Sequence, residues 1–449
     1  MYLSRKNLKI LMFMLIFLSE SICVGQIFVP MAFWQCKANG LTSSDLSSLD
    51  YNKGTFVNTT LSGNSVVLSV GQSTGTYTSR AIDLFGGCPP LGTWFNFSWI
   101  TSRPFGKEIP SIDENAVDYS NIVTGLRTNL VAYYKLNETT TGTAPGATDF
   151  KDESASAAHG TRTGAPTMGV SGRLLNAVTT SSGNYIQLGT VLGSLGSSDV
   201  TQATWIKTLN ASAGVVINNR NVNTDRTMSL HIGWWAGAAT GNGKAYFSND
   251  GPGCETGAIS TTTVTDGNWH HIVGVRRSLS NYEIYVDGVL EATNNIIIGS
   301  GCTSSNADST ANWEIGRHGA WATTFAGTLD EVMMWRRALS AGEVQSLFQR
   351  GGNRLKFQLR TCTQVACADS PVWQGPDGTA ATFFTEINNN SIPLTGLGTV
   401  LTTSPTLLFT NFPSAVFGTN RFFQYKITFE TDKSTISPDL ISTTVNEIP

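Results

Sequence analysis

Three carboxylates within one short stretch have residue types that could hydrolyse a glycoside. Glu283, Asp287 and Glu291 follow one another at a spacing of four residues. Glycoside hydrolysis needs two carboxyl groups on either side of a sugar, roughly 5–9 Å apart. Asp287 is followed by Gly288, and an Asp-Gly pair between β-branched and aromatic residues is the strongest local signal for a hairpin turn. We therefore expect these acids to straddle the tip of a hairpin, and we predict that they are not catalytic.

Two further motifs suggest chemistry but have simpler interpretations. Gly71–Gly75 (GQSTG) has the spacing of a nucleophile elbow, which needs a helix after the serine. The residues that follow, Tyr77–Arg80, have strand character, so we predict a turn. His270 and His271 are neighbours on an expected strand, so their side chains point to opposite faces and cannot form a metal-binding pair. His270 is expected to fill part of the sheet interior.

The elements around these residues are mostly strands. Trp269–Val275 and Tyr282–Val286 alternate in strand fashion, and the chain has 45 glycines with only 14% charged residues. Helical patterns are few, so we predict an all-β protein. One short helix is expected where Ser340 can act as the cap, Glu343 lies three residues on, and Gly351-Gly352 ends the pattern.

The first 25 residues have the layout of a secretory signal peptide. Basic residues precede the apolar run Ile10–Leu18, and Cys23-Val24-Gly25 offers small residues for cleavage. The run is too short to span a bilayer. A lipid-anchored Cys23 is the alternative, and Ile22 before it is bulkier than that processing usually takes. We predict a secreted or cell-surface protein with no transmembrane span in the mature chain.

The charge balance disfavours nucleic acid as a partner. Removal of residues 1–25 takes away three basic residues and Glu20, which moves the formal net charge from −3 to about −5. No basic field remains to attract a phosphate backbone.

The mature chain would retain six cysteines, and an even number in an exported protein suggests disulfides. Six cysteines allow fifteen pairings, so the sequence alone does not fix them. The expected domain organisation favours the pairs Cys36–Cys88, Cys254–Cys302 and Cys362–Cys367. A zinc site is the alternative, but only the last two cysteines are close together and no histidine lies near them.

The two ends of the chain carry strands that lack a complete sheet of their own. Tyr77–Leu84 and Thr93–Thr101 alternate before residue 106, and Arg354–Arg360 and Arg421–Phe429 alternate after the helix. Each set is too small for a sandwich. We therefore predict one β-sandwich made from residues 26–126 and 352–449, with residues 127–351 inserted as a separate unit.

The inserted unit resembles the laminin-G-like, concanavalin A-like jelly-roll family. The resemblance covers about half of the chain and is carried by Trp269-His270-His271, Tyr282–Gly288, Phe325–Val332, Arg337–Ser340 with Glu343, and Val131–Glu138 with Asp152 and His159-Gly160. The flanks resemble a bacterial surface-protein sandwich that carries such insertions, through Gly75–Arg80, Trp94–Trp99, Phe357–Arg360, Gly375–Gly378 and Arg421–Tyr425. Together the resemblances imply a concanavalin A-like jelly roll inserted into a second β-sandwich.

The resemblance also implies a structural Ca²⁺ where the first and last strands of the jelly roll meet. Asp330 would supply a carboxylate, and Glu138 with its neighbour Asn137 could contribute further oxygens, since calcium takes six to eight. The alternative is that Asp330 accepts hydrogen bonds from backbone in a turn.

Candidate ligand-binding residues lie in the loops of the jelly roll. Trp321 is in a loop rich in glycine and threonine, and Trp235 or its neighbour should face outwards if their segment is a strand. Asn219, Arg220 and Asp225 lie in a polar loop that could hydrogen-bond hydroxyl groups. Most aromatic residues of a jelly roll belong to the core, which is the alternative for the tryptophans.

We predict a non-catalytic recognition or adhesion protein that binds a glycan or a surface protein. The reason is a rigid scaffold with long polar loops and no convergent acid, base or nucleophile. A glycoside hydrolase is one alternative, and it requires paired carboxylates over a groove. A structural component of a surface fibre is another, and it requires a large apolar self-complementary patch.

Overall fold

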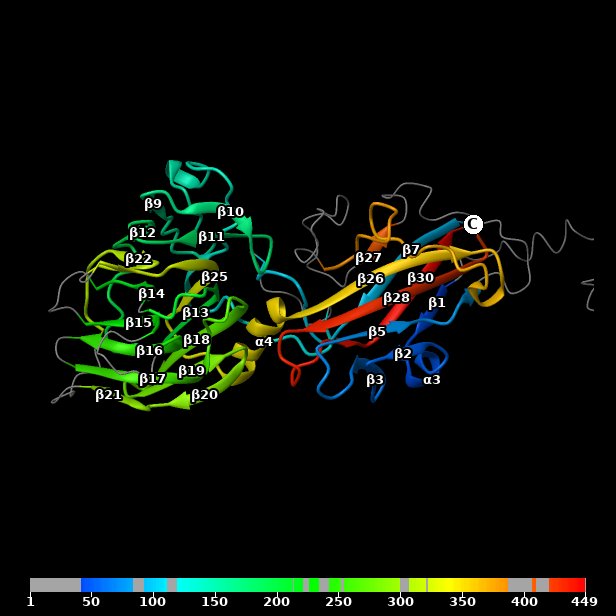
Figure 1. Cartoon of the computed structure of the whole chain (residues 1–449), viewed down its shortest axis with the longest axis horizontal. Helices are drawn as coiled ribbons and strands as arrows, with labels where there is room; N and C mark the ends of the chain where they lie inside the picture. The colour runs from blue at the N-terminus through cyan, green and yellow to red at the C-terminus, as the bar shows by residue number, and fades with distance from the viewer. Residues whose placement is uncertain are drawn as a thin grey trace, which may run out of the picture.

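The computed structural model describes residues 42–83, 93–110, 119–212, 214–220, 226–233, 242–251, 254–298, 307–319, 322–386, 406–408 and 420–448. The chain is almost entirely β-structure, as predicted, and Figure 1 shows two units side by side. In these described ranges, no helix is both long and apolar enough to cross a bilayer.

The jelly roll consists of two facing sheets between residues 130 and 335. The first sheet has the order β10 (Thr167–Ser171), β11 (Asn176–Thr180), β25 (Gly327–Trp335), β13 (Val200–Lys207), β18 (Trp269–Arg277), β19 (Asn281–Val286), β20 (Val289–Thr293), with β8 (Leu130–Tyr134) also paired to β25. The second sheet has the order β21 (Ile296–Ile298), β17 (Cys254–Thr263), β16 (Lys244–Gly251), β15 (Thr227–Ile232), β14 (Gly214–Asn218), β22 (Trp313–Ile315), β12 (Tyr185–Gly189), β9 (Thr161–Thr163). A small ribbon pairs β23 (Arg317–His318) with β24 (Thr323–Thr324).

Apolar residues from both sheets fill the space between them. Ile206 and Val286 from the first sheet and Phe247 and Trp313 from the second belong to one buried cluster. Because side chains alternate along a strand, the intervening residues of the second sheet face away from this core. That outward face is where polar side chains can gather.

The second unit is a β-sandwich to which both ends of the chain contribute. One sheet has the order β1 (Thr42–Asp45), β30 (Ser442–Ile448), β7 (Thr93–Ile100), β27 (Thr406–Leu408). The facing sheet has the order β2 (Thr55–Val57), β5 (Thr74–Thr78), β28 (Phe422–Thr431), β26 (Asn353–Cys362), with β6 (Ile82–Asp83) paired to β28. A third, small sheet orders β29 (Asp439–Leu440), β4 (Ser65–Leu68) and β3 (Thr59–Ser62).

Aromatic residues from the two ends of the chain hold the sandwich together. Trp99 stacks on Phe357 with ring centroids 4.0 Å apart, and Phe97 packs against Tyr425 at 5.2 Å. Lys426 of β28 pairs with Thr78 of β5, so the same sheet contains strands from before and after the jelly roll. This confirms the predicted all-β architecture, a jelly roll combined with a sandwich built from both flanks.

Several local predictions are also confirmed. β19 and β20 form a hairpin in which Asp287 and Gly288 have positive φ angles of 51° and 76°. The helix α4 (Ala341–Gly352) begins with a capping box formed by Ser340 and Glu343. The GQSTG motif begins in the turn after β4 and runs into β5, so it continues as a strand. The other helical segments among the described residues are short: α3 (Ser48–Tyr51), η1 (Pro145–Ala147) and η2 (Val365–Cys367).

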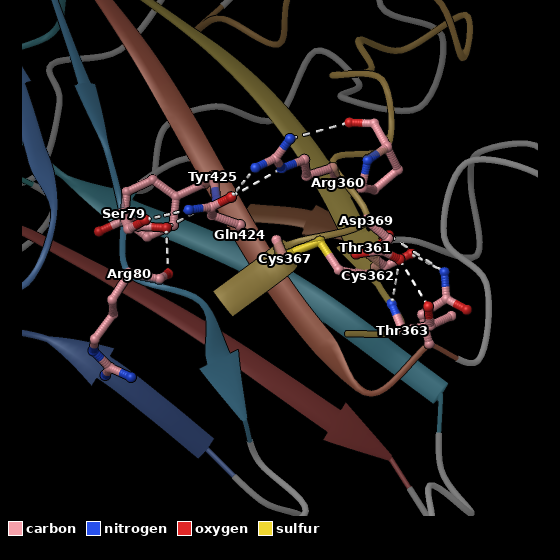
Figure 2. Close-up of a disulfide and its surroundings, with 12 residues drawn as sticks. Ser79, Arg80, Arg360, Thr361, Cys362, Thr363, Cys367, Asp369, Gln424 and Tyr425 are labelled. Carbon is pink, nitrogen blue, oxygen red and sulfur yellow. Dashed lines mark hydrogen bonds between the residues drawn. A yellow bond between two sulfur atoms is a disulfide. The ribbon is translucent and has the colours of Figure 1, made fainter. Parts of the chain in front are cut away.

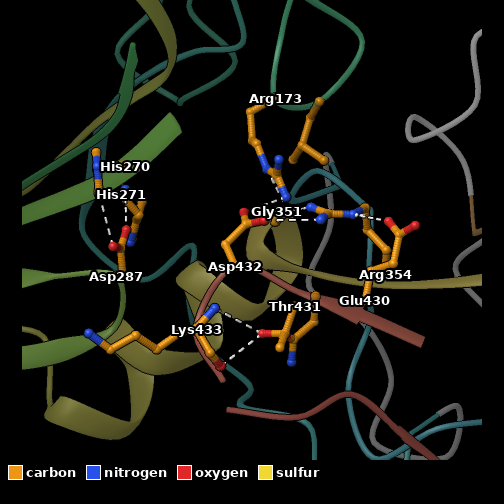
Figure 3. A network of polar contacts seen from close by, with 12 residues as sticks. Arg173, His270, His271, Asp287, Gly351, Arg354, Glu430, Thr431, Asp432 and Lys433 are labelled. Carbon is orange, nitrogen blue, oxygen red and sulfur yellow. Dashed lines mark hydrogen bonds and ion pairs between the residues drawn. The ribbon is translucent and has the colours of Figure 1, made fainter. Parts of the chain in front are cut away.

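The two units are joined through α4, which continues into β26 without a linker (Figure 1). Figure 3 shows Arg173 of the jelly roll reaching across this junction. Its Nε donates to the Gly351 carbonyl at 2.7 Å, and its Nη2 lies 2.6 Å from Asp432 of the sandwich. Asp432 also accepts from Arg354 at 3.0 Å. The jelly roll is therefore fixed to the sandwich by side chains as well as by the chain.

Candidate binding site

A surface pocket of about 320 Å³ lies on the second sheet of the jelly roll. Tyr185 and Gln187 of β12 and Glu314 of β22 line it, together with Arg220, Arg317 and the loop around Asn312. Their neighbours Ile186 and Ile315 are buried in the core, so the alternation of the strands turns the lining residues outwards. Most of the lining residues are polar or charged, and strands that pair with one another hold several of them in place.

A carboxylate and a guanidinium are held together inside this pocket. Nη1 of Arg317 donates to both oxygens of Glu314, at 2.8 and 3.0 Å. The same guanidinium lies 4.9 Å from the ring centroid of Tyr185 and covers one face of that ring. Burial raises the pKa of Glu314, and the charge and hydrogen bonds of Arg317 oppose this rise. Glu314 therefore offers a hydrogen-bond acceptor in a fixed orientation, beside the fixed donor Arg317.

The predicted polar loop contributes to this site in part. Arg220 lines the pocket and is almost fully buried. Asn219 is buried but does not line the pocket: its amide donates to the Ser309 carbonyl at 2.8 Å and its oxygen accepts from Thr227. Asn219 therefore ties the Arg220 loop to the neighbouring segment. Trp321, Trp235 and Asp225 lie outside the described residues.

A second polar cluster lies on the same face of this sheet, on β15, β16 and β17. Ser248 donates to Oε1 of Glu255 at 2.5 Å, and Nε2 of His231 lies 3.7 Å from the same oxygen. Burial, followed by the charge of Glu255, raises the pKa of Tyr246 to about 12. Polar groups thus extend across the outward face from the pocket towards β17, although these four side chains are themselves buried.

Sequence reasoning missed Glu314, Arg317, His231 and Glu255. Glu314 is a single acid between two large apolar residues, Trp313 and Ile315, which is a weak signal for a polar site on a core strand. The alternation of polar and apolar residues in β15 indicates a strand with one polar face. It does not indicate which strand from elsewhere in the chain pairs with it.

The three acids of the hairpin region are engaged separately. Glu283 accepts from Arg277 at 2.9 and 3.1 Å, and Glu291 accepts from the backbone amides of Thr261 and Thr262, both at 2.8 Å. Asp287 accepts from the backbone amide of His271 at 3.0 Å. Each carboxylate thus has its own set of bonds: Glu283 and Asp287 bond within the first sheet, and Glu291 bonds to β17 of the second sheet.

Asp330 and Glu138 both accept hydrogen bonds from backbone amides. Oδ2 of Asp330 accepts from Arg173 at 2.7 Å and from Leu174 at 2.9 Å, and Oε1 of Glu138 accepts from Lys151 at 2.8 Å. Burial raises the pKa of both carboxyl groups. Across the described ranges, no three histidine, cysteine or acidic residues gather in a metal-binding arrangement.

Calcium at Asp330 remains a prediction. N–H donors occupy Oδ2, and a cation could be held only through Oδ1, which is buried and has no hydrogen-bond partner among the described residues. Isothermal titration of the protein with CaCl₂ tests this, and the absence of any heat of binding would exclude the site.

Cys362 and Cys367 form a disulfide, as predicted, and Figure 2 shows it at the end of β26. Their Cα atoms are 5.1 Å apart, within the usual range for this bond. Cys36, Cys88 and Cys302 lie outside the described residues, as does the side chain of Cys254. The other two predicted pairings remain predictions.

Residues 180–345 match the family model described as Concanavalin A-like lectin/glucanases superfamily. Comparison with curated proteins gives no match. Among solved structures, the chain is similar to the binding domain of Paraclostridial Mosquitocidal Protein 1, with 15% identity, a TM-score of 0.38, and coverage of 56% of this chain and 64% of that one.

Two further solved structures have comparable similarity. Domain 4 of AbnA, a GH43 extracellular arabinanase from Geobacillus stearothermophilus, in complex with arabinotriose, is 17% identical at a TM-score of 0.36, over 49% of this chain and 98% of that one. The botulinum neurotoxin serotype D binding domain is 12% identical at a TM-score of 0.34, over 50% and 51%. The chain spans less than two thirds of the length of the mosquitocidal and neurotoxin domains. These similarities concern the fold alone.

Proposed function

We propose that this chain, in which residues 180–345 form a concanavalin A-like domain, is a recognition protein that binds a glycan in the Glu314–Arg317 pocket. The main support is that Glu314, an acceptor, and Arg317, a donor, hold each other in place. Both line a polar pocket of about 320 Å³ on the second sheet of the jelly roll. Small-molecule sites use a few precisely placed polar groups for orientation. Sugar hydroxyl groups both donate and accept, so one hydroxyl could donate to Glu314 while another accepts from a guanidinium.

The size of the pocket favours a small polar ligand over a protein surface. Stable protein interfaces bury about 1,200–2,000 Å² in total, whereas small-ligand sites are clefts of about 300–1,000 Å³. A pocket of about 320 Å³ is at the lower end of the second range. One or two sugar units would fit it better than a folded partner would.

The composition of the pocket supports binding without hydrolysis. Of the described residues that line it, Glu314 supplies the one carboxylate, and Arg317 neutralises that carboxylate directly. A glycosidase needs a second carboxylate on the other side of the sugar. We therefore assign Glu314 the role of hydrogen-bond acceptor.

Export from the cytoplasm is part of the same proposal. The apolar run Ile10–Leu18 after basic residues supports cleavage near residue 25. Amino-terminal sequencing of the protein recovered from its native host tests this. A mature chain that begins at Met1 would contradict it.

A glycan array with the full-length protein tests the binding site. The wild type is expected to bind one class of neutral or weakly acidic glycan. Glu314→Gln keeps the shape but removes the charge and one of the two oxygens that accept from Nη1 of Arg317. It should weaken that binding at least tenfold, because hydrogen bonds to a charged group contribute about 1.5–3 kcal/mol. Glu291→Gln, on the hairpin away from the pocket, is the matched control and should bind as the wild type does.

The outcomes are distinguishable. Equal binding by wild type and Glu314→Gln, with unchanged melting temperatures, would place the site elsewhere. Binding to no glycan would overturn the proposal. Release of new reducing ends from a bound glycan, lost in Glu314→Gln, would identify a hydrolase instead.

A further inference from the structure

The outward face of the second unit, the sandwich, carries a group of cations beside a row of hydroxyls. Leu355, Phe357 and Leu359 of β26 point into the core, so the alternate residues Arg354 to Arg360 point outwards. The pairing of β26 with β28, and of β28 with β5, extends this outward face across neighbouring strands. Figure 1 shows β26, β28 and β5 side by side.

Two cations on this face share one tryptophan ring. Cζ of Arg360 lies 4.3 Å from the centroid of Trp373, and Nζ of Lys426 lies 5.1 Å from the same centroid. The negative potential of an aromatic face attracts cations at these distances. The ring therefore holds two like charges close to one another.

The segment that carries Trp373 is fixed on both sides. The Cys362–Cys367 disulfide closes the turn after β26, and Arg360 donates to the Pro371 carbonyl at 3.2 Å. On the other side of the ring, the amide and carbonyl of Gln374 both bond to Leu359, at 2.9 and 3.0 Å. The cation arrangement is thus built into the fold and does not depend on a free loop.

Arg360 and Lys426 differ in their hydrogen-bond partners. Arg360 donates from Nε and Nη2 to the Gln424 side chain at 2.9 and 2.6 Å, which Figure 2 shows. Within the described residues, the ammonium of Lys426 has neither a hydrogen bond nor an ion pair, and its contact is with the Trp373 ring. Burial and then the charge of Arg360 lower the pKa of Lys426. A nearby anion would offset the repulsion between Arg360 and Lys426.

The neighbouring Lys356 provides a useful contrast. It lies on the same outward face of β26, but its Nζ pairs with Glu430 at 2.9 Å. Its charge is therefore already neutralised. Of these two lysines, only Lys426 offers a cation to an incoming ligand.

A row of threonine hydroxyls adjoins Lys426. Thr74, Thr76 and Thr78 alternate along β5 and face outwards, and Thr78 pairs with Lys426 across the sheet. Thr428 of β28 pairs with Thr76 on the same face. In the described part of the chain these hydroxyls make no hydrogen bond. Hydroxyls on alternate residues of a strand are about 7 Å apart, a spacing at which successive groups of an extended chain could bind.

We propose that this face of the sandwich binds an acidic polysaccharide, with an anionic group at Lys426 and Arg360 and neighbouring sugar hydroxyls along the β5 threonines. The anion is a carboxylate or a sulfate ester, which share the oxyanion chemistry that ammonium and guanidinium groups bind. Nucleic acid fits less well, because its affinity depends on many phosphate contacts and this chain has a formal net charge of −3. The site is separate from the Glu314 pocket and does not depend on it.

Binding of soluble polymers to the full-length protein, measured by calorimetry at low salt, tests the proposal. Polygalacturonate carries carboxylates, dextran sulfate carries sulfates, and neutral dextran carries neither. Binding is expected to one or both acidic polymers and to weaken as salt is raised. Binding to one of them alone would identify the anion. Equal binding to neutral dextran, or binding to none of the three, would overturn the proposal.

Three variants locate the site. Lys426→Met should weaken binding about tenfold, the effect of one lost charge-assisted contact, whereas Lys356→Met is the matched control and should leave it unchanged. Lys426→Arg keeps the cation and should retain most of the affinity, which separates loss of charge from loss of folding. Equal weakening by Lys426→Met and Lys356→Met would overturn the site.

Two further measurements distinguish this surface from the jelly-roll pocket and from a nucleic-acid site. Binding of a neutral glycan, which tests the jelly-roll pocket, is measured separately on the same protein, so that failure of the acidic-polymer site and failure of the jelly-roll site are distinguishable. Tighter, Lys426-dependent binding to duplex DNA would identify a nucleic-acid surface and overturn the assignment to polysaccharide.

Discussion

At the scale of single residues, two adjacent histidines show how strand geometry gives neighbours different environments. His271 is fully buried against Trp205, with ring centroids 5.0 Å apart, whereas His270 is partly exposed between Asp287 and Asp266, at 2.9 and 3.2 Å. The prediction of opposite faces is confirmed. The alternation places His270 on the face of Ile206 and Ile272, which line the core between the sheets, and His271 on the opposite face with Trp205, under α4.

The pKa values of the two histidines are also shifted in opposite directions. Burial lowers the pKa of His271 to about 4. Burial opposes protonation of His270 as well, but the hydrogen bonds and charges of Asp287 and Asp266 outweigh it and raise its pKa. The contribution of His270 to stability is present below the unfolded pKa and is lost as the pH rises through its folded value.

We expect His271 to make the protein less stable in mild acid. Between its unfolded pKa of about 6.5 and its folded pKa of about 4, the unfolded chain binds more protons, so stability falls as the pH falls. The loss between pH 7 and pH 5 should be about 2 kcal/mol. Urea unfolding at the two pH values measures it.

His271→Leu removes this titration and should flatten the difference between the two pH values. His270→Gln is the control, since it removes a group whose titration acts in the other direction and should leave the acid loss in place. An unchanged acid loss in His271→Leu would contradict the assignment.

At the scale of elements, α4 depends on two glycines at its carboxyl end. A Cβ on Gly351 would come within 2.7 Å of the Trp205 ring, and one on Gly352 within 2.4 Å of the Phe348 ring. Gly351 lets the last turn of the helix lie directly on the jelly roll, and Gly352 leaves room for Phe348 of the same helix. Gly342, at the other end of the same helix, has no atom within 4 Å of a Cβ position.

We expect alanine to act oppositely at the two ends of α4. Gly351→Ala should lower the free energy of unfolding by about 1–3 kcal/mol, because an added methyl group in a packed contact forces a shift. Gly342→Ala should raise it by several tenths of a kcal/mol through helix propensity alone. Chemical denaturation of both variants compares them directly. A stabilising Gly351→Ala would show that Trp205 moves aside freely.

Elements defined by nearby residues could be predicted from the sequence, and those defined by distant pairing could not. The Asp287-Gly288 turn and the Ser340 capping box are local signals, and both are present. The binding pocket depends on β22 lying beside β12, a pairing of Ile315 with Ile186 that no local pattern specifies. For this reason the sequence did not indicate that Glu314 lies beside Tyr185 and Gln187 in the pocket.

At the scale of the whole molecule, the sequence indicated a sandwich from both chain ends because neither flank has enough strands alone. The order of those strands is set by aromatic packing between residues far apart in sequence, such as Trp94 with Phe423 at 5.1 Å. We propose that the domain boundaries lie near residues 126 and 352, where β8 begins shortly afterwards and α4 ends. Limited proteolysis with mass spectrometry of the fragments tests these boundaries.

We expect Arg173 of the jelly roll and Asp432 of the sandwich to be energetically coupled across the junction between the two units. Its guanidinium contacts the Gly351 carbonyl and Asp432, and it lies 5.2 Å from the Trp205 ring. Arg173→Met should destabilise the protein by about 1–2 kcal/mol, since it leaves a partly buried carbonyl and carboxylate with fewer partners. A double-mutant cycle with Asp432→Asn should give a coupling energy on the order of 1 kcal/mol. Strictly additive effects would indicate that the contact does not join the two units.

The shared sandwich also sets an order for assembly during synthesis. β1 and β7 leave the ribosome long before β30, the strand that pairs with both of them. Every strand of the jelly roll pairs with strands between residues 130 and 335, so that unit can complete its core before β30 has been synthesised. Until then β1 and β7 lack their pairing partner. The nascent chain therefore carries an incomplete apolar sheet through most of its translation, the kind of exposed surface that chaperones protect.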